Sequence, residues 1–306
     1  MTYAPCPTTQ LWVVDIPLRV GYNNCAMWPD TLTVREKSQT ERAIGALRDV
    51  PWAARLVREA APLLQPMSQS ARSQAKMGVL LETRFAYELH RTGHSVEYEY
   101  GTGVGGSTVD FHVSGPPEWL IEIVSVQASD AMRRATRTDG VFSEVLLTTD
   151  AEDPAQSEES ELIRVQEKIG EKVLDSQGRP TKFPQSDGAL HVILTDVRGL
   201  LCSDVDDYGE IAYGSEGLSP DKKWKIHFWN GAPIRGLFDR ANPLRASELV
   251  RKRIHFLGFV HEHTYRDGEI ADRARSFANP HLLPDEAERR QALTSYPLQP
   301  ECRQTD

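Results

Sequence analysis

The spacing of apolar and polar residues changes several times along this chain, and the changes mark the predicted elements. Over 78–89 the apolar residues recur every three or four positions, as on one face of a helix. Residues 96–100 and 108–113 alternate with a period of two on either side of the glycine-rich run 101–107, which predicts a β-hairpin. The apolar run 119–126 is typical of a strand covered on both faces.

The segments that flank this region carry patterns of their own. Apolar residues at helical spacing predict a helix over 161–174, and 189–197 is interpreted as a buried strand. Upstream, the patterns at 43–50 and 53–64 are helical. Residues 1–74 are therefore predicted to form a mainly helical region.

Short strand and helix patterns follow the core region, 75–198. We expect an α+β extension, 199–284, that packs on the core and extends its sheet, and then a frayed polar tail, 285–306. The predicted elements of the extension are strands at 224–228 and 234–238, a helix at 246–253, and a hairpin over 255–270 that turns at 266–268.

Three acidic residues interrupt these apolar patterns. Glu82 lies on the same predicted helix stripe as Phe85 and Leu89, Asp110 lies on the second strand of the hairpin, and Glu122 lies inside the apolar run. An unpaired buried charge is costly, so buried carboxylates usually find a partner or coordinate a metal. Together the three residues predict a divalent-cation site.

Two of the carboxylates also have a structural interpretation. An arginine such as Arg84 or Arg133 can neutralise Glu82 in place of a cation. Asp110 can cap the turn beside it. The sequence leaves these alternatives open.

The order of the elements is similar to that of a known superfamily. A helix with Gly78-x-x-x-Glu82, a strand, a strand with Asp110, a strand with Glu122, a helix and a strand resemble the core of the PD-(D/E)XK phosphodiesterases over residues 78–197. The resemblance implies a restriction-endonuclease-like α/β fold with an αβββαβ core and a mixed sheet. It also implies that Glu82, Asp110 and Glu122 hold Mg²⁺ or Mn²⁺.

One position departs from the pattern of that superfamily. Its members carry a lysine two residues after the strand glutamate, which orients or activates the attacking water, whereas this chain has Val124 there. Some members place the lysine on the following helix. On that predicted helix Gln166 lies on the inner stripe, where some nuclease subfamilies carry a glutamine, Lys172 lies at the edge, and Lys168 lies further toward solvent. Lys172 is thus the first candidate and Lys168 the second, and a surface pair of Lys168 with Glu171 is the alternative.

The charge of the chain bears on its partner. A formal net charge of −9 repels a polyanion at long range, so binding to nucleic acid needs a local basic patch. Two patches occur in the sequence, at 133–137 and 245–253. An acidic run at 150–161, which is predicted to be a flexible loop, counteracts their positive charge.

Composition excludes several classes of protein. With 306 residues, of which 40% are hydrophobic and 26% charged, the chain has the composition of an ordinary soluble protein. It lacks an apolar run of about eighteen residues and an N-terminal signal pattern, which predicts neither a membrane span nor secretion. Four widely spaced cysteines argue against a thiolate zinc site and suit the cytoplasm: Cys6, Cys25, Cys202 and Cys302.

Three further motifs are interpreted structurally. The run 101–107 resembles a phosphate loop, but it lacks the Gly-Lys-Ser ending and a following helix, so a hairpin turn is expected. His261-Glu262-His263 makes an incomplete ligand set, because adjacent side chains on a strand alternate faces. His112 shares a face with Asp110 and is expected to be a hydrogen-bonded histidine of the sheet.

These observations support three hypotheses. The leading one is a metal-dependent nuclease that hydrolyses phosphodiester bonds of DNA or RNA, with DNA favoured and a role in restriction or defence implied by the resemblance. The alternative is a catalytically inactive binding or assembly module of the same fold. The third is a scaffold that contacts partner subunits or a second copy of the chain.

Overall fold

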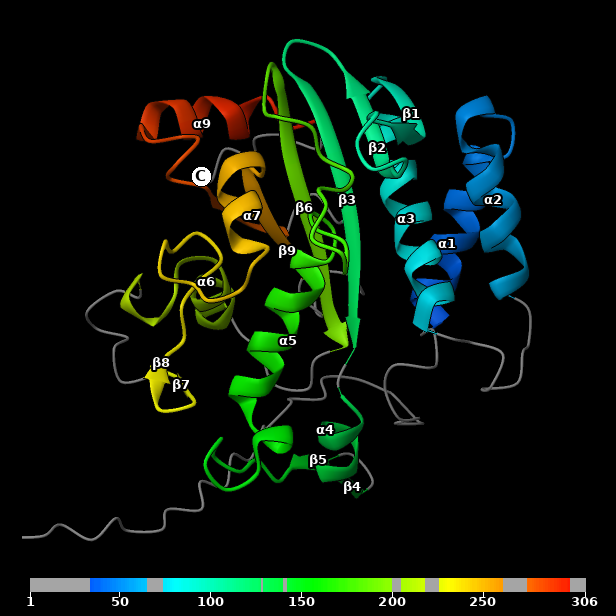
Figure 1. Cartoon of the computed structure of the whole chain (residues 1–306). Coiled ribbons are helices and arrows are strands. Elements are labelled where there is room, and N and C mark those ends of the chain that lie inside the picture. The colour runs from blue at the N-terminus through cyan, green and yellow to red at the C-terminus, as the bar shows by residue number, and fades with distance from the viewer. Residues whose placement is uncertain are drawn as a thin grey trace, which may run out of the picture.

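A six-stranded mixed sheet lies at the centre of the molecule, with helices on both of its faces (Figure 1). The computed structural model describes residues 34–64, 74–127, 129–139, 142–199, 205–217, 226–260 and 274–297. Within these ranges the strand order is β1-β2-β3-β6-β9-β10. The strands are β1 Ser95–Gly101, β2 Thr108–Ser114, β3 Glu118–Gln127, β6 Ala189–Gly199, β9 Phe256–Val260 and β10 Ala274–Ala278.

The sheet is parallel in the middle and antiparallel toward both edges. β3 pairs with β6 and β6 with β9 in parallel. β1 with β2, β2 with β3, and β9 with β10 pair antiparallel. The predicted hairpin, the buried strand after it and a mixed α/β sheet are therefore confirmed.

Three helices cover one face of the sheet. The first two agree with the predicted helical region as far as it is described, and the third is the helix predicted over 78–89. They are α1 Val34–Leu47, α2 Ala54–Ala60 between the 3₁₀ turns Pro51–Ala53 and Ala61–Leu64, and α3 Gln74–Arg91. The apolar stripe of α3, which includes Leu81 and Phe85, packs with Ile121 and Ile123 of β3. Burial of this stripe provides the hydrophobic free energy that fixes α3 on the sheet.

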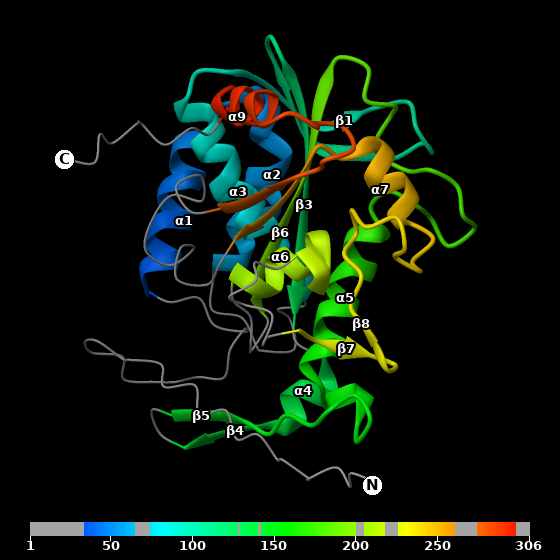
Figure 2. The same cartoon turned by 90° about the vertical axis from the view of Figure 1, so that its left-hand side faces the viewer.

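The opposite face is covered by α5 Glu158–Gly170, α6 Val205–Tyr213 and α7 Ser247–Arg253, which face the viewer in Figure 2. Leu162 and Val165 of α5 pack with Leu120 and Val124 of β3. Since successive strand residues point to opposite faces, Glu122 shares the α5 side of the sheet with Leu120 and Val124.

α5 begins and ends earlier than the predicted helix. Ser157 caps its N-terminus, because the hydroxyl accepts a hydrogen bond from the backbone of Ser160 at 3.1 Å. Glu158 and Glu159 then lie in the first turn, where acidic side chains interact favourably with the helix dipole. The prediction of a flexible acidic loop is wrong here, and Pro154–Gln156 before it forms a 3₁₀ turn.

The chain leaves α5 at Gly170 rather than at residue 174. A Cβ at this glycine would lie 2.8 Å from Cβ of Ala246, so the helix end approaches the C-terminal extension closely. A side chain at this position would therefore force the two segments apart.

Between β3 and α5 the chain forms a small separate unit. It consists of α4 Asp130–Ala135 and a two-stranded sheet of β4 Thr136–Asp139 and β5 Phe142–Val145. The first basic patch, 133–137, lies here, at the bottom of Figure 1.

The C-terminal extension continues the sheet through β9 and β10, as predicted, and α7 confirms the predicted helix. The strand predicted at 234–238 is wrong, because this segment is a buried turn. A Cβ at Gly236 would lie 2.2 Å from the backbone nitrogen of Gly214, so the turn packs directly on the end of α6. Of the strand predicted at 224–228, the described part pairs only through β7 Phe228–Trp229 with β8 Ala232–Pro233, after the 3₁₀ turn Ser215–Gly217.

The tail is not frayed over 286–297. It forms α9 Glu286–Thr294, and the ring of Tyr296 packs edge-on against Trp119 of β3 with 5.0 Å between centroids. Trp119 also donates its indole N–H to the carbonyl of Ser295 at 3.1 Å. A contact across 176 residues thus orders a segment with little local apolar periodicity.

Some predictions lie outside the described residues. They concern the four cysteines, His261-Glu262-His263 and the turn at 266–268. Among the helices that are described, none combines the length and the hydropathy needed to cross a membrane.

Candidate active site

Two of the predicted carboxylates meet where β2 diverges from β3. The register of the two strands runs from Val113 opposite Trp119 to Phe111 opposite Ile121. Asp110 follows at the end of this register, and its Oδ2 accepts a hydrogen bond of 2.6 Å from the backbone N–H of Ile123. Asp110 therefore lies against the backbone beside Glu122, whose side chain is buried.

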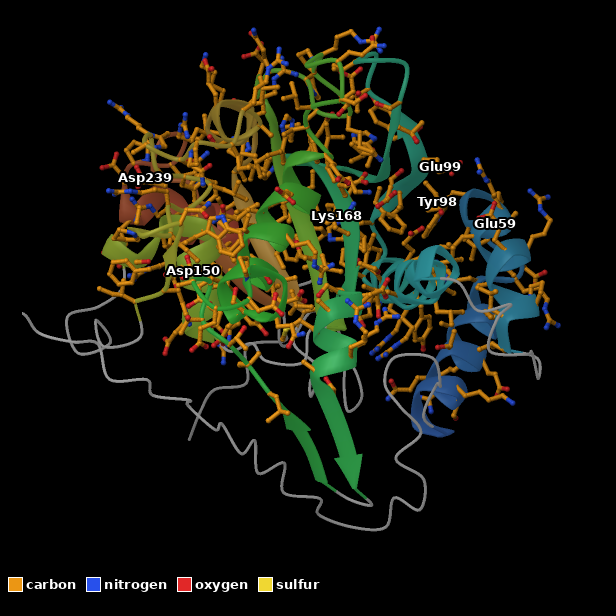
Figure 3. All side chains as sticks on the ribbon, turned by 60° about the horizontal axis from the view of Figure 1, so that its bottom comes forward. Glu59, Tyr98, Glu99, Asp150, Lys168 and Asp239 are labelled. Carbon is orange, nitrogen blue, oxygen red and sulfur yellow. The ribbon has the colours of Figure 1, made fainter. Side chains whose placement is uncertain are left out.

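Glu82 reaches the same place from α3. Its Oε2 accepts a hydrogen bond of 2.8 Å from the hydroxyl of Tyr98 on β1, which Figure 3 labels. One turn earlier, a Cβ at Gly78 would lie 3.4 Å from Oγ of Ser125 and 3.9 Å from Oε1 of Glu82. The small residue thus lets α3 approach β3 where the glutamate is needed.

The pKa values indicate that the carboxylates act as one electrostatic unit. Burial raises the pKa of Asp110 well above its ordinary value, and the charges of Glu122 and Glu82 raise it further. Burial also raises the pKa of Glu82, with the hydrogen bond from Tyr98 acting against it and the charge of Glu122 acting with it. The charge of Lys172 lowers the pKa of Glu82, so a lysine acts on this carboxylate, whereas the sequence interpretation named an arginine.

Two lysines share the carboxylate of Glu122. Lys172 Nζ and Lys182 Nζ each lie 2.8 Å from it. The side chain of Glu122 is 1% exposed, whereas those of Lys172 and Lys182 are 29% and 21% exposed. Burial alone would lower the pKa of Lys172, but the combined attraction of Glu122, Asp110 and Glu82 raises it overall.

A tight turn after α5 brings both lysines to the site. Leu174 forms a bridge with Pro180, and the backbone N–H of Thr181 donates to the carbonyl of Val173 at 2.9 Å. Residues 172 and 182 therefore lie on adjacent arms of the turn. We call this segment, residues 172–182, the lysine turn.

The glycine-rich hairpin connection holds the second arm of the lysine turn. The backbone N–H of Lys182 donates to Oγ of Ser107 at 3.0 Å, and Lys182 Nζ donates to the carbonyl of Thr108 at 2.9 Å. A Cβ at Gly105 would lie 2.9 Å from the carbonyl oxygen of Pro180, so the glycine permits this close approach. The run 101–107 is a hairpin connection, as interpreted, and it also positions Lys182.

The structure places Lys172 beside Glu122 and also brings Lys182 there, which the sequence reasoning missed. Lys182 lies in the loop before β6, where no periodic pattern assigns a direction to its side chain. The one sequence feature that points toward it is Val124, which stands where the superfamily pattern has a lysine. A lysine at the site must therefore come from another segment.

Gln166 lies on the inner face of α5 and Lys168 lies toward solvent, as predicted, but neither is brought to the carboxylates that they were expected to support. Gln166 is buried between α5 and the extension, where its amide donates to the carbonyls of Arg235 at 2.9 Å and Ile211 at 3.3 Å. Lys168 is exposed on α5 (Figure 3) and pairs with Glu171 at 2.8 Å, which was the alternative interpretation. The inner stripe of α5 contacts α6 as well as the sheet, and an inward side chain can meet either.

His112 is a hydrogen-bonded histidine of the sheet, as expected. Its Nδ1 lies 3.1 Å from Glu97 and its Nε2 lies 3.4 Å from Glu118. The imidazole also stacks on Tyr100 with 4.3 Å between centroids. Both ring nitrogens therefore have partners.

The second basic patch, 245–253, is largely engaged by the fold. Arg251 donates to the carbonyl of Asp239 at 2.6 Å, Arg253 donates to the carbonyl of Phe183, and Lys252 pairs with Glu248. The bond from Arg253 anchors the residue directly after Lys182, so this patch supports the lysine turn.

The three carboxylates are not as tightly grouped as ligands around a bound ion. Among the described residues, one group of three ligand-type side chains has its ligand atoms all within 4.8 Å of one another, and it comprises Glu158, Asp207 and His227. The sequence reasoning missed that group, because its members come from separate segments without a shared motif. At the candidate active site, the ammonium groups of the lysine turn form ion pairs with the carboxylate of Glu122.

Comparison of the chain with protein-family models, with curated proteins and with solved structures gave no match.

Proposed function

We propose that this protein is a metal-dependent nuclease of the PD-(D/E)XK type that hydrolyses phosphodiester bonds, with DNA as the expected substrate and RNA as the alternative. The observation that carries the proposal is that Glu82, Asp110 and Glu122 come together with Lys172 and Lys182 where β2 diverges from β3. The order α3-β1-β2-β3-α5-β6 fits a restriction-endonuclease-like core.

The side-chain types at the site suit Mg²⁺ or Mn²⁺. Carboxylate oxygens are the ligands that these hard cations prefer, and Glu82, Asp110 and Glu122 would supply them. If all five groups are ionised, the three carboxylates and two lysines leave one negative charge. Burial first, and then the charges of the neighbouring carboxylates, raise the pKa of Glu82 and Asp110. When bound, such a cation lowers the pKa of a coordinated water and neutralises the nonbridging oxygens of the phosphate.

The lysine turn supplies what Val124 cannot. A lysine two residues after the strand glutamate would place an ammonium group beside that carboxylate, and Lys172 and Lys182 both place one there. A lysine whose side chain is 21% or 29% exposed can contact a phosphate while its ammonium group remains near Glu122. We assign to these lysines the stabilisation of charge that develops on the phosphate.

Cleavage assays test the proposal directly. Purified protein is incubated with end-labelled single-stranded DNA, double-stranded DNA and RNA, with Mg²⁺, with Mn²⁺ or with EDTA. We expect cutting only with the metal ions, and a loss of at least about 100-fold in Asp110→Asn and Glu122→Gln, because each removes a ligand charge. Lys168→Met is the matched control, since it removes a lysine of α5 that pairs with Glu171 away from the site. Intact substrate across this panel refutes the proposal.

A second function is favoured by one feature of the same site. Both oxygens of Glu122 are already engaged by ammonium groups, which is the arrangement expected of an inactive module that keeps its fold through a closed ion-pair network. Calorimetric titration with Mn²⁺ separates the two. The nuclease binds an ion that is lost in Asp110→Asn, whereas the inactive module gives the same titration with and without Asp110→Asn.

A further inference from the structure

A second cluster of ligand-type side chains lies at the opposite end of α5 from the lysine turn. It includes Glu158, the first residue of α5, which is twelve helix positions from Gly170. At 1.5 Å per residue the helix separates these positions by about 18 Å. The cluster is therefore distinct from the candidate active site.

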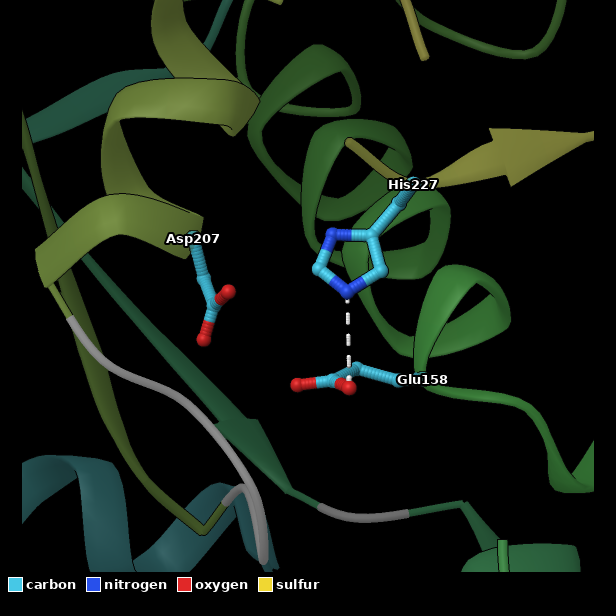
Figure 4. A group of neighbouring side chains, drawn as sticks. All are labelled: Glu158, Asp207 and His227. Atoms are coloured by element: carbon cyan, nitrogen blue, oxygen red, sulfur yellow. Dashed lines mark ion pairs between the residues drawn. The ribbon is translucent and has the colours of Figure 1, made fainter. Parts of the chain in front are cut away.

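Three segments contribute to the cluster, and Figure 4 shows them together. Glu158 comes from α5, Asp207 from the first turn of α6, and His227 from the residue before β7. One ligand atom from each lies within 4.8 Å of those of the other two. Nε2 of His227 is 3.4 Å from Oε2 of Glu158, and Asp207 is buried.

A fourth residue fixes the orientation of the imidazole. Glu210, one turn after Asp207 on α6, is 2.6 Å from Nδ1 of His227 through Oε2 and accepts the backbone N–H of His227 through Oε1 at 3.2 Å. Its side chain is 1% exposed, and the hydroxyl of Ser215 donates to it. The imidazole is therefore held by one nitrogen, while the other faces Glu158 and Asp207.

We propose that Glu158, Asp207 and His227 bind a divalent transition-metal ion, with zinc as the expected ion. Nε2 of His227 and one carboxylate oxygen each from Glu158 and Asp207 would be the ligands. One imidazole with two carboxylates suits zinc better than magnesium or calcium, which prefer oxygen ligands alone. Glu210 has the position of the carboxylate that orients a metal-binding histidine through its second nitrogen.

Helix dipoles stabilise only two of the three carboxylates at this cluster. Glu158 and Asp207 each lie in the first turn of a helix, where a carboxylate is favourable. Glu210 lies past the first turn of α6 and receives little of this benefit. Among the four side chains, three carboxylates face one imidazole, and a divalent cation would offset part of this negative charge.

A metal ion at this cluster would join the core to the C-terminal extension. α5 packs on β3, whereas α6 and the segment before β7 belong to the extension. The ion would cross-link these segments, and we expect it to raise the thermal stability of the full chain. This inference does not depend on the proposed nuclease function.

Zinc titration of the full chain tests the inference. The background is Asp110→Asn with Glu122→Gln, which disables the candidate active site, so that ions bound there do not contribute. After treatment with EDTA and dialysis, ZnCl₂ is titrated by calorimetry, bound zinc is measured by elemental analysis, and thermal unfolding is followed by circular dichroism.

We expect one zinc ion per chain and a rise in melting temperature on adding zinc. In the same background His227→Gln should weaken binding at least about 100-fold, and Glu210→Gln, which keeps the three ligands, should weaken it by about 10- to 100-fold. Glu159→Gln is the matched control, because it removes a neighbouring charge of the same helix turn outside the group, and it should bind as the background does.

Absence of zinc uptake by the background overturns the inference. Equal affinity in the background and in His227→Gln overturns it as well. If His227→Gln does not fold, Glu158→Gln provides the same test, because its side chain is 25% exposed and its replacement removes one ligand charge.

Discussion

Replacing both lysines at Glu122 tests whether the carboxylates form a cation site, separately from any assay of cleavage. We consider Lys172→Met, Lys182→Met and the double variant. Methionine keeps most of the apolar stem and removes the charge. Glu122 retains one ammonium partner in each single variant and none in the double variant.

The expected destabilisation follows from burial. Removal of one partner from a fully buried ion pair costs about 3–5 kcal/mol. The lysine side chains are 29% and 21% exposed, and the other lysine remains, so each single variant should lose only about 1–2 kcal/mol. The double variant leaves three carboxylates without either cation and should lose about 4–6 kcal/mol, more than the sum of the single variants.

A divalent cation should restore stability where the lysines are absent. A ligand at a free concentration of 100 Kd stabilises the folded state by about 2.7 kcal/mol. We expect Mg²⁺ or Mn²⁺ to stabilise the double variant more than the natural chain, because the excess negative charge is greater.

The assay is urea unfolding followed by tryptophan fluorescence, with and without Mg²⁺ in large excess over the protein. Lys168→Met is the control, since its lysine pairs with Glu171 on the surface. Absence of Mg²⁺-dependent stabilisation in the double variant would refute the idea that the carboxylates form a cation site. Strictly additive losses would contradict the sharing of Glu122 by both lysines.

Three further predictions concern the fold. Gln166→Leu removes hydrogen bonds to Arg235 and to Ile211 and should cost about 2–3 kcal/mol in urea unfolding, with unchanged activity per folded molecule. Burial, reinforced for His191 by His255, lowers the pKa of both histidines to about 4, below the ordinary 6.5, so the unfolded chain binds more protons between these values. The free energy of unfolding should therefore be highest above pH 6.5 and fall toward pH 4. At pH 5 the loss should be about 2 kcal/mol per histidine. The loss should be smaller in His255→Gln, which keeps only one of the two histidines. Gly236→Ala should lower the melting temperature sharply, because the added Cβ would lie 2.2 Å from a backbone atom. Gly45→Ala in α1 is the control. Its Cβ would meet no atom within 4 Å, and the free energy of unfolding should rise by about 0.5–1 kcal/mol.

Local patterns in the sequence determined the order of elements and the faces of the central strands. A period of two specifies which strand residues point together, so Glu122 could be assigned to the face of Val124 without a structure. A period of three to four similarly placed Glu82 with Phe85. These assignments succeeded because both periodicities act within a few residues.

Tertiary structure decided which lysine meets the carboxylates. Lys182 is 60 positions from Glu122, and it arrives there only because α5 ends at Gly170 and the chain turns back. No periodic pattern in the sequence predicts these two features. The end of α5 is accompanied by a close approach to Ala246, and the turn is held by the glycine-rich hairpin connection.

The same reason explains α9 and the second cluster. Trp119 orders α9 across 176 residues, and His227 meets Glu158 only when the extension packs on α5. Contacts of this kind depend on the whole packed arrangement, because the loss of chain entropy is offset by many buried groups together and not by the neighbours of any one residue. The sequence by itself therefore determined where the carboxylates stand on their elements, and the tertiary structure alone decided which charged groups face them.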